Sequence, residues 1–376
     1  MRLAITGADG FLGWHVRVLA RALGWPRPAT VTRADLVDPA AVAAAVKGAD
    51  VVLHLAGVNR GDADDVVAGN VEPARSLAEG LRRCGEPPRR VVYANSVQAG
   101  NGTVYGSAKA AAAELLATAA GGDHEFVDVR LPNLYGEHGR PFYNSVVATF
   151  CRLLADGAEP EVREDRELDL VHVLDAAAHL TGTTLQGPWD PAMPALRTRV
   201  ALLRDRLAMF AGVYAGGEIP PLRDRHDVRL FNTYRSHRFP ERGPVPLPRH
   251  RDARGDLVEA VKAHGGGGQT FSSTSRPGVI RGQHFHLAKV ERFVVLRGRA
   301  QINLRRVDGT GTVRFAVDGS EPAFVDMPTM WAHNIVNVGS EELVTLFWTN
   351  ELFDPARPDT WAEAVDRPGR AAAGVA

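Results

Sequence analysis

Cysteine is nearly absent from this sequence of 376 residues, which contains two, Cys84 and Cys151. Two cysteines exclude a disulfide-built scaffold and a cluster of thiolate metal ligands. No apolar run reaches the roughly 18 residues that a membrane-spanning helix needs, and residues 1–6 are not the apolar core of a signal peptide. These absences predict a cytoplasmic protein with no membrane partner.

The sequence also lacks a net charge, since 44 basic residues balance 44 acidic ones. A nucleic-acid-binding domain usually carries a basic surface, so this balance argues against a nucleic-acid partner. Lysine is scarce, because all the basic residues are arginines except Lys47, Lys109, Lys262 and Lys289. Each retained lysine is a candidate for a role that arginine cannot fill, with chance retention as the alternative.

The length corresponds to two or three domains of about 150 residues each. From residue 1 to about 185, short β-branched runs alternate with Ala- and Leu-rich stretches of helical length. This alternation predicts an α/β fold, a Rossmann-type doubly wound parallel sheet. Residues 185–243 include a helical pattern and are expected to close this domain over its substrate. The Pro- and Gly-rich stretch 241–250 predicts a linker, so the first domain is expected to span 1–243.

The second domain is expected to span residues 244–366 and to contain almost only strands. Runs of β-branched and alternating residues are separated there by Gly, Asp and Pro, with little helical periodicity. This pattern predicts a small all-β barrel or jelly roll. The last ten residues, 367–376, are expected to form a disordered tail.

A glycine-rich turn follows the first predicted strand and opens the first predicted helix, with Gly7, Gly10 and Gly13 in the segment TGADGFLG. Such a turn lets backbone N–H groups approach a pyrophosphate at the helix N-terminus. We therefore predict that the turn, with Phe11 and Leu12 between its glycines, binds a dinucleotide. Tight packing of helix against strand, without a ligand, is the alternative.

The type of dinucleotide is indicated by Arg33, which lies twenty residues beyond Gly13. NAD-binding proteins usually have an acidic residue there, which holds the ribose 2′-hydroxyl, whereas an arginine can pair with a 2′-phosphate. The position therefore favours NADP(H) over NAD(H). A solvated surface arginine is the alternative.

Tyr105 and Lys109 are four residues apart at the start of a predicted helix, so they share one helix face. An ammonium group beside a phenol is expected to lower the phenol pKa and make it a proton donor and acceptor near neutral pH. Ser96 ends the preceding predicted strand and can hydrogen-bond a substrate carbonyl. We predict that these three residues are catalytic, the alternative being a surface Tyr–Lys pair.

A second constellation lies in the predicted barrel and comprises His284, His286, Glu291 and His333. Two imidazoles at positions i and i+2 of a strand point to the same face, and the other two residues can complete a set of ligands from neighbouring strands. The set predicts a Zn²⁺ site, with Fe²⁺, Mn²⁺ and Ni²⁺ as other candidates. A polar barrel lining without metal is the alternative.

The first domain resembles the extended short-chain dehydrogenase/reductase family. Besides TGADGFLG and the Ser96, Tyr105 and Lys109 set, it carries HLAGVN (54–59), RLPNLYG (130–136) and LDLVHVLDAA (168–177). The resemblance implies hydride transfer at a sugar carbon of a nucleotide sugar. It further implies roles in cofactor binding for Leu55, Ala56, Gly57 and Leu131, and in substrate binding for Asn59, Arg60, Asn133 and Asn144.

The second domain has the cupin metal motif and is similar to the nucleotide-sugar 3- and 3,5-epimerases. The similarity implies that polar groups of RDARGDLVEA and SRPGVIRGQHFH bind an anionic sugar substrate, namely Arg254, Glu259, Lys262 and Arg281. Lys289 is a candidate base or acid for the proton next to the carbonyl, as is Lys262. A solvated surface role is the alternative for each lysine.

Nearly the whole chain resembles the bifunctional capsular-polysaccharide enzymes that make UDP-2-acetamido-2,6-dideoxy-β-L-talose. The specific runs are residues 53–60, 140–151, 275–298 and 345–361. The resemblance implies that the cupin barrel holds zinc and epimerises C3, that the first domain reduces C4 with NADPH, and that the protein is a homodimer.

The chain departs from this pattern at Met330, where a cupin typically has glycine, and through residues 190–243, which resemble the family least. The C2 substituent of the sugar and the nucleotide therefore stay open. Two other interpretations also stay open. One is a 4-keto-sugar reductase whose barrel is structural, and the other is a non-enzymatic module that dimerises and senses nucleotide sugars.

Overall fold

The computed structural model describes residues 1–120, 125–183 and 195–366. They form two compact units. Unit 1 comprises Met1–Thr149 and Val162–Leu203, and unit 2 comprises Phe150–Glu161 and the chain from Arg204 onward. The expected tail at 367–376 and part of the expected closing region, 184–194, lie outside the described residues.

Unit 1 is built on a parallel sheet with the strand order β2-β1-β3-β4-β5. The strands are β1 (Leu3–Thr6), β2 (Ala29–Val31), β3 (Val51–His54), β4 (Arg90–Ser96) and β5 (Glu125–Leu131). β1 and β3 are buried along their whole length because helices cover both faces of the sheet. The chain leaves β1 toward β2 on one side and returns to β3 on the other. The carboxyl ends of β1 and β3 thus form the switch point at which such sheets bind ligands.

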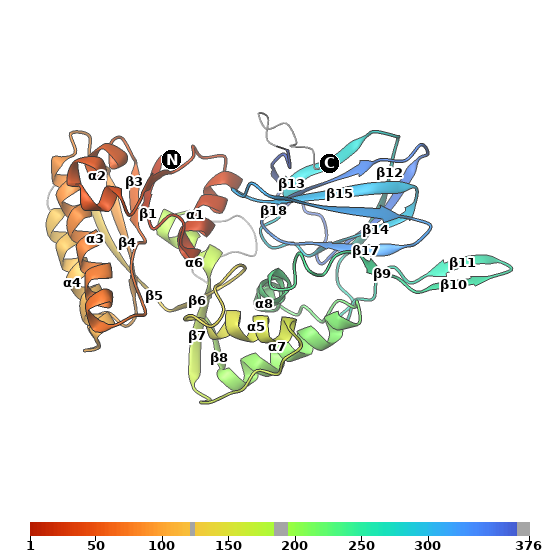
Figure 1. The fold of residues 1–376 in the computed structure, drawn as a ribbon, viewed down its shortest axis with the longest axis horizontal. Coiled ribbons are helices and arrows are strands. Elements are labelled where there is room, and N and C mark those ends of the chain that lie inside the picture. The colour runs from red at the N-terminus through yellow and green to blue at the C-terminus, as the bar shows by residue number, and fades with distance from the viewer. Residues whose placement is uncertain (121–124, 184–194, 367–376) are drawn as a thin grey trace. The chain divides into compact units, whose positions relative to one another are not determined.

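Helices pack on the two faces of this sheet, with α2, α3 and α4 on one and α1 and α6 on the other (Figure 1). Their bounds are α1 (Phe11–Ala22), α2 (Pro39–Val46), α3 (Ala63–Arg83), α4 (Val104–Ala119) and α6 (Val173–Thr181), with a 3₁₀ turn at Asp35–Val37. Several begin at a side-chain cap that accepts an N–H of the first turn, as Asp38, Asp62 and Thr103 do. The predicted doubly wound α/β fold is confirmed.

A small second sheet of unit 1 lies beyond β5. It has the order β6-β7-β8, with β6 and β7 parallel and β8 antiparallel to β7. The strands are β6 (Asn133–Tyr135), β7 (Glu167–His172) and β8 (Leu196–Arg199). Helix α5 (Val146–Ala155) lies between β6 and β7 in the sequence. The segment with RLPNLYG thus runs from the end of β5 through β6.

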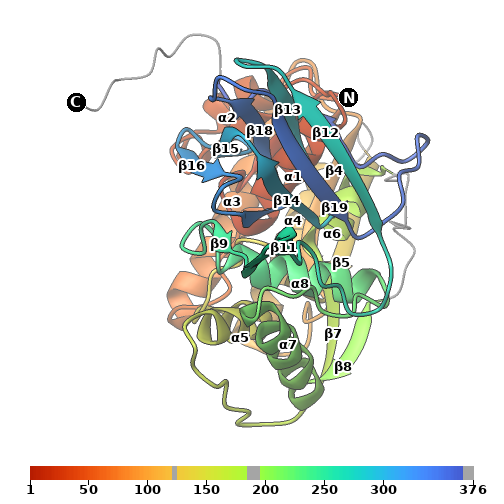
Figure 2. The ribbon, with the colours of Figure 1, turned by 90° about the vertical axis from the view of Figure 1, so that its right-hand side faces the viewer.

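Unit 2 contains two antiparallel sheets whose apolar inner faces form one core (Figure 2). One sheet has the order β12-β19-β14-β17-β9, and the other β16-β15-β18-β13-β20. The strands are β9 (Val245–Pro246), β12 (Gln269–Ser275), β13 (Ile280–Phe285), β14 (Glu291–Arg297), β15 (Arg299–Arg306), β16 (Thr312–Asp318), β17 (Ala323–Met327), β18 (Trp331–Asn337), β19 (Leu343–Thr349) and β20 (Trp361–Ala362). This arrangement confirms the predicted cupin-like β domain.

The compact units divide the chain at 203/204, whereas the sequence pattern placed the boundary at 243/244. Helices α7 (Val200–Ala215) and α8 (Arg225–Ser236) supply the reason, because the chain around them is bonded to the barrel. Arg292 of β14 pairs with Asp326 of β17 at 2.7 and 2.8 Å, and both side chains are buried. Tyr214 of α7 donates to the same carboxylate, and Arg292 donates to the carbonyl of Gly217.

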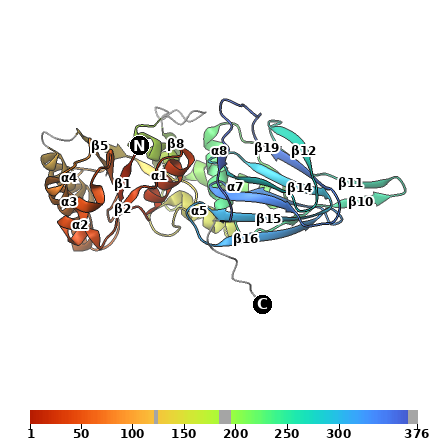
Figure 3. The same ribbon diagram turned by 90° about the horizontal axis from the view of Figure 1, so that it is seen from above.

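A hairpin of β10 (Arg249–Asp252) and β11 (Gly255–Val258) forms a separate two-stranded sheet. It projects from the barrel in two views (Figures 1 and 3). The stretch expected to be a linker, 241–250, therefore contains β9, which pairs with β17, and the start of this hairpin.

The structure also describes the two cysteines and the apolarity of the helices. Cys84 and Cys151 are both free thiols. None of the helices in the described parts of the chain has the length and apolarity to cross a membrane.

Candidate functional site

The turn after β1 and the turn after β3 are joined by one side chain. The hydroxyl of Thr6 accepts the backbone N–H groups of Leu55 and Ala56, both at 3.1 Å, and lies 2.8 Å from Nδ1 of His54. Gly7 has a φ of 68°, and a Cβ there would lie 2.7 Å from the nitrogen of Ala56. Glycine is therefore required at position 7, and it brings the two turns into contact at the switch point of the sheet.

Helix α1 begins directly at the glycine turn, with Gly10 as its N-cap and Phe11 and Leu12 as its first residues. No side chain caps its first N–H groups, which are the groups that bind a pyrophosphate in dinucleotide-binding folds. A Cβ at Gly13 would lie 2.2 Å from the carbonyl oxygen of Gly7, so the glycine lets the helix approach the turn. The geometry suits the predicted cofactor turn.

Arg33 lies exposed just beyond the end of β2. Nearby Asp35 is engaged locally, because its carboxylate accepts the N–H and the hydroxyl of Thr32, both at 2.7 Å. These hydrogen bonds lower the pKa of Asp35. The role of Arg33 at a cofactor phosphate stays a prediction.

Ser96 ends β4, and Tyr105 and Lys109 lie near the start of α4. Burial raises the pKa of Tyr105, and a hydrogen bond with Ser96 acts in the opposite direction. Lys109 is buried, and its Nζ donates to the carbonyl of Ala94 at 2.7 Å and lies 4.1 Å from the centre of the Tyr93 ring.

The pKa of Tyr105 differs in direction from the one expected from the sequence. The Tyr–Lys spacing predicted a lowered value, whereas the net shift is upward because burial outweighs the hydrogen bond. Burial instead lowers the pKa of Lys109 to about 7, with Asp128 acting against it. Lys109, and not Tyr105, thus has a pKa close to neutral pH.

Of the predicted substrate residues of unit 1, Asn59 and Arg60 follow β3, Asn133 begins β6 and Asn144 precedes α5. Asn59, Arg60, Asn133 and Asn144 are all exposed. Arg60 donates to the carbonyl of Tyr143, which ties the turn after β3 to the loop before α5. Leu131, a predicted cofactor contact, ends β5, and its carbonyl accepts the N–H of Val97 at 3.1 Å.

A buried hydrogen bond that the sequence analysis did not identify joins Glu137, directly after the RLPNLYG segment, to His172 at the end of β7. Nε2 of His172 lies 3.0 Å from Oε2 of Glu137, and both side chains are almost fully buried. Nδ1 of His172 accepts the N–H of Leu174 at 3.3 Å, so Nε2 carries the proton and donates to the carboxylate. Residues 137 and 172 are far apart in the sequence, and no spacing rule joins them.

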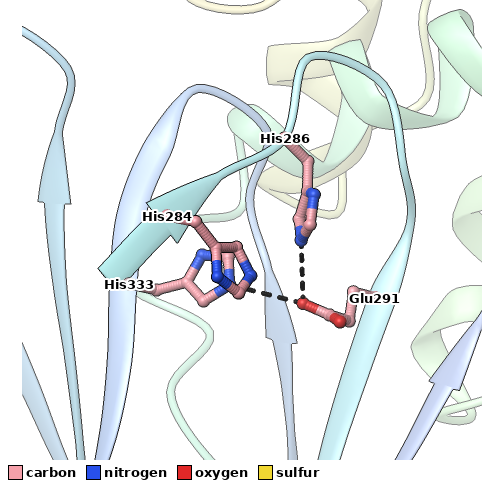
Figure 4. Close-up of side chains that lie close together, drawn as sticks. All are labelled: His284, His286, Glu291 and His333. Atoms are coloured by element: carbon pink, nitrogen blue, oxygen red, sulfur yellow. Dashed lines mark hydrogen bonds and ion pairs between the residues drawn. The ribbon is translucent and has the colours of Figure 1, made fainter. Parts of the chain in front are cut away.

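The four predicted metal ligands are brought together in the barrel (Figure 4). His284 and His333 are cross-strand partners on β13 and β18, and Glu291 begins β14. A β-bulge in β13 places Gln283, with a φ of 65°, between Gly282 and His284. A bulge re-aims the side chains that follow it.

The ligand atoms of this cluster all lie within 4.8 Å of one another. Oε2 of Glu291 lies 3.0 Å from Nε2 of His286 and 3.3 Å from Nε2 of His333. Burial acts to raise the pKa of Glu291, but the two imidazoles outweigh it and hold that pKa well below its ordinary value. Burial and the other two imidazoles lower the pKa of His284 to about 3.

The imidazoles are oriented by backbone carbonyls. Nδ1 of His286 lies 2.5 Å from the carbonyl oxygen of Asp359, and Nδ1 of His333 lies 3.1 Å from that of Trp331. A carbonyl only accepts, so each Nδ1 is a donor, and each Nε2 is the ring atom that faces Glu291. Three neutral imidazoles and one carboxylate fit Zn²⁺, and metal-ligating histidines commonly donate their other N–H in this way.

The other predicted barrel residues lie at several places. Arg254, at the tip of the β10–β11 hairpin, pairs with Asp252 at 2.6 Å. Glu259 pairs with Lys262 at 2.8 Å. Arg281 on β13 donates to the hydroxyl of Ser275 at 2.8 Å.

Lys289, the predicted base or acid, is buried, and its Nζ donates to the carbonyl of Pro358 at 2.6 Å. It lies close enough to His286 to act against protonation of that imidazole. The sequence analysis missed Asp359 of the same segment, whose carboxylate accepts the N–H of Lys289 at 2.8 Å. A signal was present, because Asp359 falls within the specific run 345–361.

Comparison with known families divides the chain in the same order as the fold. The NAD dependent epimerase/dehydratase family matches residues 3–181, and the polysaccharide biosynthesis C-terminal domain matches residues 250–361. Among curated proteins, a ceramide reductase of Caulobacter vibrioides is 30% identical over 199 residues, which are 47% of this chain and 59% of that protein.

Two relatives match both units. The crystal structure of CapF, a capsular polysaccharide assembling protein of Staphylococcus aureus, is similar with a TM-score of 0.59 and 30% identity, covering 97% of this chain and all of CapF. The UDP-2-acetamido-2,6-beta-L-arabino-hexul-4-ose reductase of Pseudomonas aeruginosa is 30% identical over 375 residues, covering 97% of this chain and 99% of the relative. Because this identity extends over nearly the full length of both chains, the protein belongs to the family of the UDP-2-acetamido-2,6-beta-L-arabino-hexul-4-ose reductases.

Proposed function

We propose that this protein is a bifunctional nucleotide-sugar enzyme. Its barrel epimerises C3 of a UDP-linked 4-keto-2-acetamido-2,6-dideoxy-L-hexose, and unit 1 reduces the C4 ketone with NADPH. The product is a UDP-2-acetamido-2,6-dideoxy-L-talose-type sugar for a polysaccharide or another glycosylated product. We further infer a cytoplasmic homodimer, as the bifunctional family implies.

The observation that carries the proposal is the presence of two candidate sites of different chemistry in one chain. In unit 1, Ser96 hydrogen-bonds Tyr105, and a buried Lys109 follows in the same helix, whereas unit 2 brings together three imidazoles and a buried carboxylate. The name of the Pseudomonas relative specifies a ketone at C4 of a UDP-sugar, and the Staphylococcus relative assembles capsular polysaccharide. The first name supports a 4-keto nucleotide sugar as substrate, and the second supports a role in polysaccharide assembly.

In the reductase half, the glycine turn with Gly7, Gly10 and Gly13 would hold NADPH, which would supply the hydride for C4 of the sugar. Ser96 and Tyr105 hydrogen-bond the C4 carbonyl oxygen, which positions the ketone and draws electron density toward that oxygen. As the hydride reaches carbon, the Tyr105 hydroxyl transfers its proton to the oxygen and forms the C4 hydroxyl. The Lys109 ammonium, held by the carbonyl of Ala94, stabilises the phenolate that this transfer leaves.

In the epimerase half, His284, His286, Glu291 and His333 would hold Zn²⁺, which would supply positive charge next to the enediolate formed by loss of the C3 proton. A base on one face of the sugar removes that proton, and an acid on the other face returns one to C3. Lys289 is our candidate for one of these roles. Because reduction of C4 removes the acidity of C3, epimerisation precedes reduction.

The test follows the keto sugar by NMR in D₂O, with and without NADPH, using enzymatically made UDP-2-acetamido-2,6-dideoxy-4-keto-L-hexose. We expect deuterium at C3 without NADPH, and reduction at C4 once NADPH is added. His333→Ala should abolish the exchange and spare reduction of an already epimerised ketone.

Reduction without any exchange at C3 would contradict the epimerase half and leave a 4-keto-sugar reductase with a structural or sensing barrel. Tight binding of the sugar without either reaction would favour the non-enzymatic module. If neither reaction nor binding occurs, the sugar is wrong, and a panel of other 4-keto nucleotide sugars tests the C2 substituent.

A further inference from the structure

We propose that Asp359 is the positioning residue of the barrel's metal site, acting through the metal ligand His286. The inference rests on the proposed metal site and extends it to a residue outside the ligand set. Asp359 lies in the segment after β19 and far from the histidines in the sequence, yet it bonds to the loop that joins two ligand-bearing strands.

The carboxylate of Asp359 collects four N–H donors. They are the backbone N–H groups of Leu287 (2.9 Å), Ala288 (2.9 Å) and Lys289 (2.8 Å), and Nε1 of Trp361 (3.0 Å). Each carboxylate oxygen accepts two of them. Three consecutive N–H groups that converge on one anion fix the backbone between His286 and Glu291.

The backbone of Asp359 holds the ring of His286 directly. Its carbonyl oxygen accepts the proton on Nδ1 of His286 at 2.5 Å, which leaves Nε2 as the ligand atom facing Glu291. Asp359 has a φ of 39°, in the left-handed region that residues with a Cβ rarely adopt. The hydrogen bonds of its carboxylate therefore hold a backbone conformation that presents the carbonyl to the imidazole.

The same segment also supports the strand that bears His284. Residues of β20 pair with β13, with Ala362 opposite His284 and Trp361 opposite Phe285. The N–H of Glu363 donates to the carbonyl of Gln283, the residue of the β-bulge, at 2.9 Å. Asp359 thus stands at the start of a stretch that holds two of the three histidines, and it is the part that a single substitution can test.

The experiment measures zinc binding to the full-length chain after removal of metal, by competition with a chromophoric chelator. Asp359→Asn keeps the size of the side chain but cannot accept from all four donors, and we expect zinc affinity to fall about 10- to 100-fold. The matched control is Asp354→Asn. That carboxylate in the same segment, whose side chain is 40% exposed, accepts from Ala356 and Arg357, and its loss should leave zinc affinity unchanged.

A second readout separates positioning from loss of fold. The Co²⁺-loaded protein should show the intense visible absorption of a four-coordinate site, and Asp359→Asn should weaken this band while the melting temperature of the metal-free chain stays near that of Asp354→Asn. If Asp359→Asn does not fold, Asp359→Glu replaces it, because it keeps the charge but displaces the carboxylate, and a smaller loss of zinc affinity is expected.

The outcomes distinguish this inference from the proposed function. Folded Asp359 variants that bind zinc as tightly as the wild type would overturn the inference alone. A wild-type chain that binds no zinc would overturn both the inference and the metal site. Zinc binding that depends on Asp359, without deuterium exchange at C3, would support the inference and contradict the epimerase function.

Discussion

Lys109 in unit 1 and Glu291 in unit 2 are both buried groups that carry charge in water, yet their pKa values respond differently to burial. Burial lowers the pKa of Lys109 from 10.5 to about 7, and the opposing interaction with Asp128 does not reverse this shift. Burial acts on Glu291 in the same sense, against its charge, but His286 and His333 reverse the effect and keep the carboxylate ionised.

The comparison teaches what each site is built to hold. In unit 1, Lys109 exchanges its proton near neutral pH, which suits a site that transfers protons. Unit 2 keeps an anion and three imidazoles together, which suits a site that binds a cation. The predictions below test this contrast.

The largest effect is expected from Tyr105→Phe, which removes the hydroxyl that protonates the C4 oxygen. We expect reduction of the ketone, followed as NADPH oxidation in single turnovers, to fall by about 10²- to 10⁴-fold. Deuterium exchange at C3 should continue at the wild-type rate, because it takes place in the barrel. Loss of both reactions would show that the two sites are not chemically separate, and unchanged NADPH oxidation would exclude Tyr105 as the acid.

Asp326→Asn tests how much the stability of the barrel depends on the buried ion pair between Arg292 and Asp326. The substitution leaves Arg292, which is 1% exposed, without its ionic partner, and breaking a buried pair costs about 3–5 kcal/mol. The free energy of unfolding of unit 2, measured in urea, should fall by that amount. The control Asp354→Asn should change it by less than about 1 kcal/mol. A small effect of Asp326→Asn would mean that an unpaired buried charge costs the barrel little free energy. The large downward shift in the pKa of buried Lys109 would then have no counterpart in unit 2.

Arg33→Ala tests the cofactor preference of unit 1. Loss of a hydrogen-bonded ion pair to the 2′-phosphate should raise the KM for NADPH about 10- to 100-fold and leave the KM for NADH unchanged. Arg27→Ala is the matched control, because Arg27 is also exposed but precedes β2. An equal change for both cofactors would remove Arg33 from the phosphate site.

Local spacing predicts the histidine cluster, because the His284–His286 spacing predicts two neighbouring imidazoles and the structure groups them with Glu291 and His333. Tyr105 and Lys109 both lie in α4, as their spacing predicts, and their catalytic role stays a prediction. The alternation of strands and helices likewise predicts the parallel sheet, because crossover connections require that order.

Contacts between segments distant in the sequence escape such reasoning. No pattern links Glu137 to His172 or Asp359 to His286, since each pair meets only after strands have paired. The pKa of Tyr105 was predicted with the wrong sign for the same reason, because spacing indicates a neighbouring charge but not the burial that opposes it.

The smallest effect concerns pH and acts on Lys109 alone. Because its pKa is about 7, the ammonium is present at lower pH and is lost as pH rises through 7. If the ammonium supports proton transfer from Tyr105, the single-turnover rate of reduction should fall above pH 7 by up to about tenfold per pH unit. Lys109→Gln should be slow and show no such fall, while exchange at C3 keeps its own pH dependence in both proteins. A wild-type rate that rises from pH 6 to 8 would contradict this role of the Lys109 ammonium.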